Sequence, residues 1–344
     1  MFLSKGKIFS GAKKLSDGAV KIVHSLGNRR SESISLCLCI IMILFLGFTV
    51  PRYFFSSHNI GSLITSVSPE GIVALGMMLL LISGVFDLSV GSVMCLGGLV
   101  AAVALTMGLS TPVSVLLGLG SGMAIGLLNG IITELGGVNP LITTIGMMYI
   151  VRGITEITLV KRGKAGYSNL PESFRALGQG RFFGIHYMLC ILIVLALIFS
   201  VYLAKRRGGR SIYYIGGNES AAVAMGINKK KIRIILFMLS GVLAALAGII
   251  INARAGAANR YTGLSSHLNV IIACIIGGGS LAGGKGNMAG AVFGLLFLVL
   301  LNNAFNLYDV NQHVQSLVNG MVLLAVVVLD GWMNILKRRE LGKE

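Results

Sequence analysis

The chain has 344 residues, of which 55% are hydrophobic and only 12% are charged. A soluble domain carries about 25% charged residues, so this composition excludes an ordinary soluble domain and indicates an all-α protein that crosses a bilayer many times. The formal net charge of +17 does not indicate nucleic-acid binding, because the cations lie between apolar stretches instead of on one polar face.

Apolar segments recur along the chain, each close to the roughly 20 residues that a bilayer requires. The sequence predicts about ten spans, some of them short or broken, at 34–50, 62–83, 88–107, 113–132, 140–160, 185–204, 233–253, 267–282, 288–307 and 314–332. They form one transmembrane domain, 34–332, which separates a basic N-terminal tail at 1–33 from a C-terminal tail at 333–344.

The basic residues predict the orientation of these spans. If both termini are cytoplasmic, the cytoplasmic segments hold 20 Lys and Arg residues and the outer segments hold 8. This asymmetry is the one that the positive-inside rule expects. The basic loop at about 205–232 then also lies in the cytoplasm.

Glycine is dense at two turns between spans, 83–92 and 277–286. Non-helical backbone at membrane depth is tolerated only where protein or a water-filled cavity surrounds it. We therefore regard Gly91, Gly278 and Gly279 as candidates for a translocation path or its gate. Glycines at a four-residue spacing in the fourth span instead predict close helix packing.

Polar side chains in this apolar context are further candidates for the path. Asp87 is costly in a membrane, and with Ser89 it either caps the third span or takes part in transport. Asn269 and Asn302 either bond between helices or line a polar path. The residues alone leave both alternatives open.

Three other charged residues have simpler expectations. Arg152 and Glu156 are four residues apart on the fifth span, so they can form an ion pair near the membrane surface. Glu134 follows the fourth span and is expected to be solvated.

The sequence lacks the patterns of catalytic chemistry. Gly279 to Lys285 reads G-x-x-x-x-G-K, but Gly286 replaces the Ser or Thr that would hold magnesium, and no strand precedes it. Cysteine and histidine do not cluster with metal-ligand spacing. We expect no catalytic site, metal or cofactor in this chain. An ion-coupled secondary transporter would need mid-membrane carboxylates, for which Asp87 and Glu156 are the candidates.

The loop at 205–232 contains a predicted short helix, Glu219 to Met225. Asn218 is a good N-cap for it, and Gly226 is a good C-cap. Such a helix between glycines could dock into a partner protein, or it could lie among lipid headgroups. The residues favour neither alternative.

Four stretches in order resemble one known family. Tyr214–Ile227, which contains IGGNESAAVAMGI, resembles the coupling loop of bacterial ABC importer permeases of the ribose, xylose, arabinose and galactose group, which includes autoinducer-2 permeases. Gly84–Ser92, the stretch from Asn139 to Gly153, and Ile276–Gly290 resemble further motifs of this family. The resemblance covers about residues 60–332.

The resemblance implies a permease subunit that imports a monosaccharide, either a ribose-like pentose, a hexose or a related solute, across the bacterial inner membrane. Its implied partners are a second permease copy or paralogue, a cytoplasmic ATPase that uses ATP and Mg, and a periplasmic or lipid-anchored sugar-binding protein. The segment implied to seat in the ATPase consists of Gly216, Gly217, Asn218, Glu219, Ala221, Ala222, Gly226 and Ile227. His267-Leu268-Asn269 replaces a stretch that is often acidic in the family, which leaves the solute open.

Overall fold

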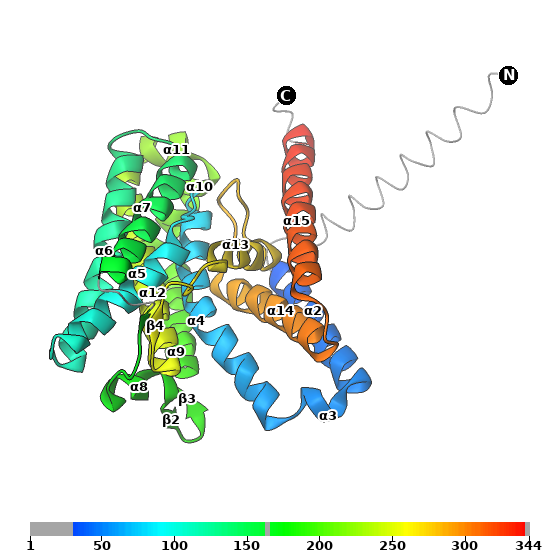
Figure 1. Ribbon diagram of the computed structural model, residues 1–344. Coiled ribbons are helices and arrows are strands. Elements are labelled where there is room, and N and C mark those ends of the chain that lie inside the picture. Colours follow the sequence, from blue (N-terminus) through cyan, green and yellow to red (C-terminus); the bar gives the residue numbers. More distant parts are fainter. Residues whose placement is uncertain (1–29, 162–165, 341–344) are drawn as a thin grey trace.

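The computed structural model describes residues 30–161 and 166–340. This part of the chain contains fourteen helices and two small two-stranded sheets (Figure 1). The predicted basic tail at 1–33 lies outside the described residues except for its last four, as do residues 341–344 of the predicted C-terminal tail.

Each predicted span corresponds to one helix. These helices are α2 (Arg30–Thr49), α4 (Ser57–Ile82), α5 (Val90–Thr106), α6 (Thr111–Glu134), α7 (Pro140–Lys161), α9 (Tyr187–Lys205), α12 (Lys229–Ala255), α13 (Ser266–Ile276), α14 (Met288–Leu307) and α15 (Gln312–Glu340). By length and composition, α4, α6, α9, α12 and α14 are apolar enough to cross a membrane. The last helix, α15, continues well into the segment predicted as a tail.

Short elements connect these helices. They are α3 (Pro51–Phe54), α8 (Glu172–Gln179), α10 (Arg207–Gly217), α11 (Glu219–Ala224), β1 (Gly166–Tyr167), β2 (Arg181–Phe182), β3 (Ile185–His186) and β4 (Ala258–Asn259). Strands β1 and β4 pair antiparallel, as do β2 and β3. In Figure 1, α10, α11 and the end of α15 lie at one end of the molecule, and α3, α8 and the β2–β3 hairpin lie at the opposite end.

The predicted span at 267–282 is wrong in its extent. Helix α13 has only 11 residues, a length of about 16 Å, which is half of a bilayer's hydrocarbon thickness. It ends at Ile276 because Gly278 adopts a φ of +90° and turns the chain. The backbone then stays non-helical until α14 begins at Met288.

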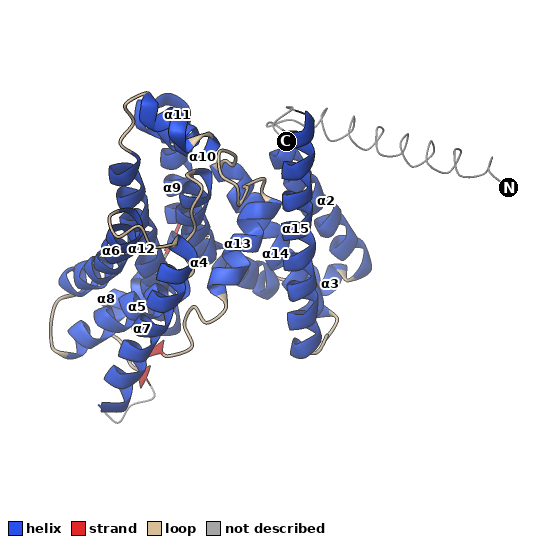
Figure 2. Cartoon of the chain, turned by 90° about the horizontal axis from the view of Figure 1, so that it is seen from above, coloured by secondary structure: helices blue, strands red, loops and turns tan. Residues whose placement is uncertain are grey.

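Helix α12 packs against α4, α5 and α6, while α2, α14 and α15 form a second group beside them (Figure 2). The glycine stripe of α6 lies in the first group. A methyl group at Gly122 would overlap the carbonyl oxygen of Gly241 on α12, and one at Gly126 would overlap that of Phe237. The predicted packing role of these α6 glycines is confirmed, since only glycine permits this approach of the two backbones.

Candidate functional site

The segment between α9 and α12 forms two helices. The predicted helix is present as α11, where the Asn218 side chain accepts a hydrogen bond from Ala221 N at 3.0 Å. Gly226 follows with a φ of +79°, as predicted for the residue that ends the helix. Helix α10 was not predicted, because its glycines lower helix propensity. Tertiary packing stabilises α10 instead, since Ile212 and Ile215 are buried.

Four charged side chains join α11 to the helices behind it. The Glu219 carboxylate contacts Lys229 Nζ at 2.7 Å and Arg233 Nη1 at 3.2 Å, and both bases lie on α12. Glu134 at the end of α6 contacts the same two atoms at 3.6 and 3.3 Å. Two acids and two bases therefore compensate one another, which lowers the cost of burying them. We call these four residues the ion network.

The ion network also reaches α4. Arg233 donates from Nη2 and Nε to the carbonyl oxygen of Ser83, at 2.7 and 3.2 Å. This oxygen belongs to the C-cap residue of α4, where carbonyl groups lack helical donors. The expectation that Glu134 is solvated is wrong. Its side chain is only 3% exposed, because the end of α6 packs against the start of α12, where Arg233 lies.

Backbone contacts make a second connection at the same place. Gly84 and Gly283, one from each glycine-rich turn, meet Gly216 at the end of α10. A methyl group at Gly283 would lie 2.8 Å from the Cα of Gly84 and 2.7 Å from the carbonyl oxygen of Gly216. Gly284 N donates to Ile82 O at 2.9 Å. We call this contact the glycine junction, and it explains why both turns are rich in glycine.

Asp87 belongs to a buried cluster of hydrogen bonds. Its Oδ1 accepts from Ser89 N at 2.8 Å and from Ser89 Oγ at 2.6 Å, and Asn129 Nδ2 lies 3.4 Å from Oδ1. All three residues are buried. Asp87 therefore orders the turn that precedes α5, although the N-cap of that helix is Ser89.

The remaining glycine candidates contact other backbone and apolar groups. A methyl group at Gly91 would overlap the carbonyl oxygen of Gly263, and one at Gly279 would lie 3.1 Å from the sulfur of Met78. Gly278 supplies the sharp turn after α13. The contacts of Gly91 and Gly279 are the ones expected of close packing, and none of the three glycines lines the polar cavity described below.

The predicted ion pair within α7 is also wrong. Glu156 pairs with Arg260 Nη1 at 3.1 Å, and Arg152 Nη1 donates to the carbonyl oxygen of Arg260 at 2.8 Å. Both α7 side chains therefore hold the loop that follows β4. The sequence suggested that Arg152 and Glu156 pair because they are four residues apart on one helix. In the folded protein both side chains instead contact Arg260.

A polar cavity of about 370 Å³ lies between α4, α12, α13 and α14. It contains two of the predicted path residues, Asn269 and Asn302. It also contains Glu70, a carboxylate within α4 that the search for mid-membrane acids missed. The signal for it was present, because an acid directly after Pro69 in an apolar span is unusual.

Comparison with known proteins shows the family. Residues 59–327 match the family described as "Branched-chain amino acid transport system / permease component". The chain belongs to this permease family. It is 36% identical over 330 residues to the L-arabinose transport system permease protein AraH of Escherichia coli, covering 96% of this chain and 99% of that protein. It is 37% identical over 300 residues to the ribose import permease protein RbsC of the same species, covering 87% and 93%.

A third relative, the L-arabinose ABC transporter permease protein AraH of Azospirillum brasilense, is 34% identical over 293 residues, covering 85% of each chain. No solved structure matches. The resemblance predicted from the sequence is thus confirmed, and the protein is an ABC importer permease, a multi-pass protein of the bacterial inner membrane with a transport role.

The permease exposes only part of its predicted coupling segment. Ala222 is fully buried, and a methyl group at Gly216 would overlap the carbonyl oxygen of Ile82. Both residues therefore pack against the permease itself. Ala222 is the one buried member of the segment, and the others are partly or fully exposed. The structure adds two exposed apolar side chains on the same segment, Val223 at 55% and Met225 at 62%.

Proposed function

We propose that this permease imports a monosaccharide and that α11 receives the force of ATP hydrolysis from a separate ATPase subunit. The observation that carries the proposal is the ion network. It joins a solvent-exposed helix of six residues to three long helices, α4, α6 and α12, through Glu219, Arg233 and Glu134. The ribose and arabinose permeases among its relatives support the choice of a sugar.

The exposed apolar side chains of α11 support a protein partner over a lipid surface. Val223 on α11 and Met225, the residue directly after this helix, lie in the chain between Glu219 and the basic start of α12. A rigid apolar surface with a charged rim is typical of protein interfaces. An ATPase that binds α11 would move Gly216 and Arg233 with it, and thereby the ends of α4 and α6.

The proposal includes a topology and an assembly. All ten helices that correspond to predicted spans would be embedded in the membrane, with α13 crossing only half of it and with both termini cytoplasmic. The end that carries α3, α8 and the β2–β3 hairpin would then face the periplasm and receive the binding protein. A second copy or paralogue of the permease would complete the path.

The proposal is tested by reconstituting the permease with its ATPase and binding-protein partners in liposomes. Uptake of labelled ribose or arabinose that requires both ATP and the binding protein is the expected result. The family description names branched-chain amino acids, so labelled leucine is the second solute to measure. Leucine uptake without sugar uptake would reverse the choice of solute. Uptake driven by an ion gradient without ATP would contradict the mechanism.

A further inference from the structure

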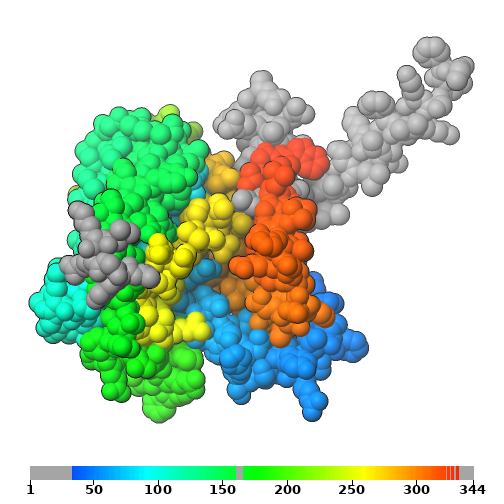
Figure 3. All heavy atoms as spheres, in the orientation of Figure 1, coloured from blue at the N-terminus to red at the C-terminus, as the bar shows by residue number. Residues whose placement is uncertain are grey.

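We propose that the permease itself holds the solute during passage, in the polar cavity beside α4, with Glu70 accepting hydrogen bonds from two neighbouring hydroxyl groups. This inference rests on the proposed import of a sugar and adds a binding site within the membrane domain. The volume of about 370 Å³ is at the small end for ligand sites and suits a single monosaccharide. Figure 3 shows the surface recessed between α15 and the yellow segment near residue 260, where blue atoms of the α4 region are visible.

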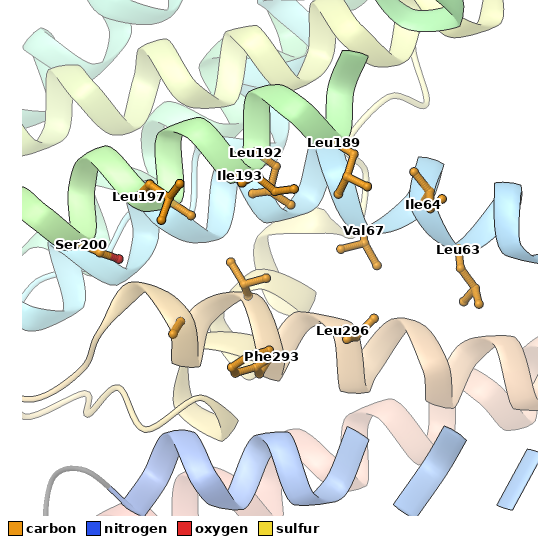
Figure 4. A pocket seen from close by; sticks show the side chains of 13 residues that line it. Leu63, Ile64, Val67, Leu189, Leu192, Ile193, Leu197, Ser200, Phe293 and Leu296 are labelled. Atoms are coloured by element: carbon orange, nitrogen blue, oxygen red, sulfur yellow. The ribbon is translucent and has the colours of Figure 1, made fainter. Parts of the chain in front are cut away.

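A second cavity, of about 380 Å³, has apolar walls and so contrasts with the polar cavity. Leucine, isoleucine and valine side chains of α4 and α9, together with Phe293 and Leu296 of α14, line that second cavity, where Ser200 is the sole polar residue (Figure 4). Hydroxyl groups placed there would lose their hydrogen bonds to water and find few in return. The two cavities are of similar size and differ in the polarity of their walls. The polar cavity has the hydrogen-bonding side chains that a sugar requires.

The acceptors of the polar cavity come from α4. Glu70 Oε1 accepts a hydrogen bond from Ser266 at 3.2 Å, and Asn269 lines the same cavity. A carboxylate has about four acceptor positions, so this bond leaves room for hydroxyl donors. Pro69 has no N–H group, so the carbonyl oxygen of Thr65 lacks its helical donor and is a further acceptor at this wall.

The donors come from the opposite walls. The Asn302 and Asn306 amide oxygens on α14 accept hydrogen bonds from Asn319 and Gln315 of α15, at 3.1 Å in both cases. These bonds orient the amides and leave their NH₂ groups to donate into the cavity, which both residues line. Arg254 at the end of α12 adds guanidinium donors. A hydroxyl group both donates and accepts, so acceptors on one wall and donors on the other match a polyhydroxylated, uncharged solute.

The test uses the full transporter with its ATPase and binding protein, in liposomes. Uptake of ribose and of 2-deoxyribose is measured for the wild type and for Glu70→Gln, a substitution that keeps the shape of the side chain. We expect Glu70→Gln to lower ribose uptake about tenfold, because the amide offers one acceptor oxygen where the carboxyl group offers two. The ratio of ribose to deoxyribose uptake should fall as well. The binding protein is the same in both preparations, so a changed ratio reports on the permease alone.

Ser66→Ala and Ser200→Ala are a matched pair, of which Ser200→Ala is the control. Each removes one hydroxyl group, from the polar and the apolar cavity respectively. We expect only Ser66→Ala to slow ribose uptake. Thermal unfolding of the Glu70→Gln protein should match the wild type, so that a folding defect is detected separately.

Three results would overturn the inference. Equal uptake by Glu70→Gln and wild type would show that the carboxylate does not contact the solute. Reduced uptake with an unchanged ratio of the two sugars would assign Glu70 a structural role. Absence of sugar uptake by the wild type would remove the proposed function on which the inference rests. The wild-type measurement alone distinguishes this result from the two results for Glu70→Gln.

Discussion

Arg233 on α12 holds the end of α4 by two hydrogen bonds to the carbonyl oxygen of Ser83, at 2.7 and 3.2 Å. The two residues are 150 positions apart in the chain. The same guanidinium contacts Glu219 on α11 and Glu134 on α6, and its side chain is only 9% exposed. One buried side chain therefore fixes four helices relative to one another at the proposed docking end.

The first prediction concerns the stability that Arg233 provides. Arg233→Ala leaves Glu134 buried without its closest partner, so we expect a loss of about 3–5 kcal/mol in the free energy of unfolding. Lys230→Ala, on an exposed residue in the same turn, should change it by less than about 0.5 kcal/mol. Thermal unfolding of the purified permease in detergent measures both. Similar unfolding temperatures for the two variants would show that the ion network is energetically unimportant.

The second prediction concerns docking through α11. Val223→Asp and Met225→Asp place a charge on exposed apolar positions, so the fold should be retained while ATPase binding is lost. We expect at least tenfold less ATPase to copurify with either variant. Phe183→Asp is the control, because Phe183 is 91% exposed on the β2–β3 turn at the opposite end of the molecule. Undiminished copurification with both α11 variants would refute the docking surface.

The third prediction compares two adjacent glycines. Gly216→Ala would drive a methyl group into the carbonyl oxygen of Ile82 and the backbone of Gly284, whereas a methyl group on Gly217 would meet no atom within 4 Å. Overpacking against backbone costs about 1–3 kcal/mol, so Gly216→Ala should lower the unfolding temperature and reduce uptake. Gly217→Ala should fold like the wild type. If the two variants unfold at the same temperature, the glycine junction is not tightly packed.

The fourth prediction is a dependence on pH. The hydrogen bond from Lys229 lowers the pKa of Glu219 below its ordinary value of 4.5, and the positive charge of Arg233 adds to this effect. A lowered pKa means that the carboxylate stabilises the folded state above pH 4.5, and that this contribution is lost as the pH falls through the folded-state pKa. The contact of α11 with α12 should therefore persist throughout the neutral range.

The measurement for this prediction is the difference in unfolding temperature between wild type and Glu219→Gln. It should be constant from about pH 8 to pH 6 and shrink below pH 4.5. The contribution is modest, because the Glu219 side chain is 48% exposed and water screens its ion pairs. Glu172→Gln on α8, away from the ion network, is the control. A difference that disappears already at pH 6 would contradict the lowered pKa.

Much of this protein follows from local sequence. The hydrophobic segments determined where ten helices lie, because the free energy of removing an apolar segment from water depends on its own composition and length. Helix α11 and its two caps were equally local, since Asn218 and Gly226 act within a few residues of themselves. The spacing of Gly118, Gly122 and Gly126 determined the face on which α6 packs.

Other features depended on residues that the chain brings together only when folded. Glu134 looked solvated in sequence, and its burial follows from Arg233, which lies 99 positions later. The meeting of Glu70 and Asn269 in one cavity was also decided by packing. The hydrophobicity of a segment gives its free energy of transfer out of water, and this free energy depends on that segment alone. Charge compensation and hydrogen bonding depend on distances of a few ångströms between segments, and only the tertiary structure decides those distances.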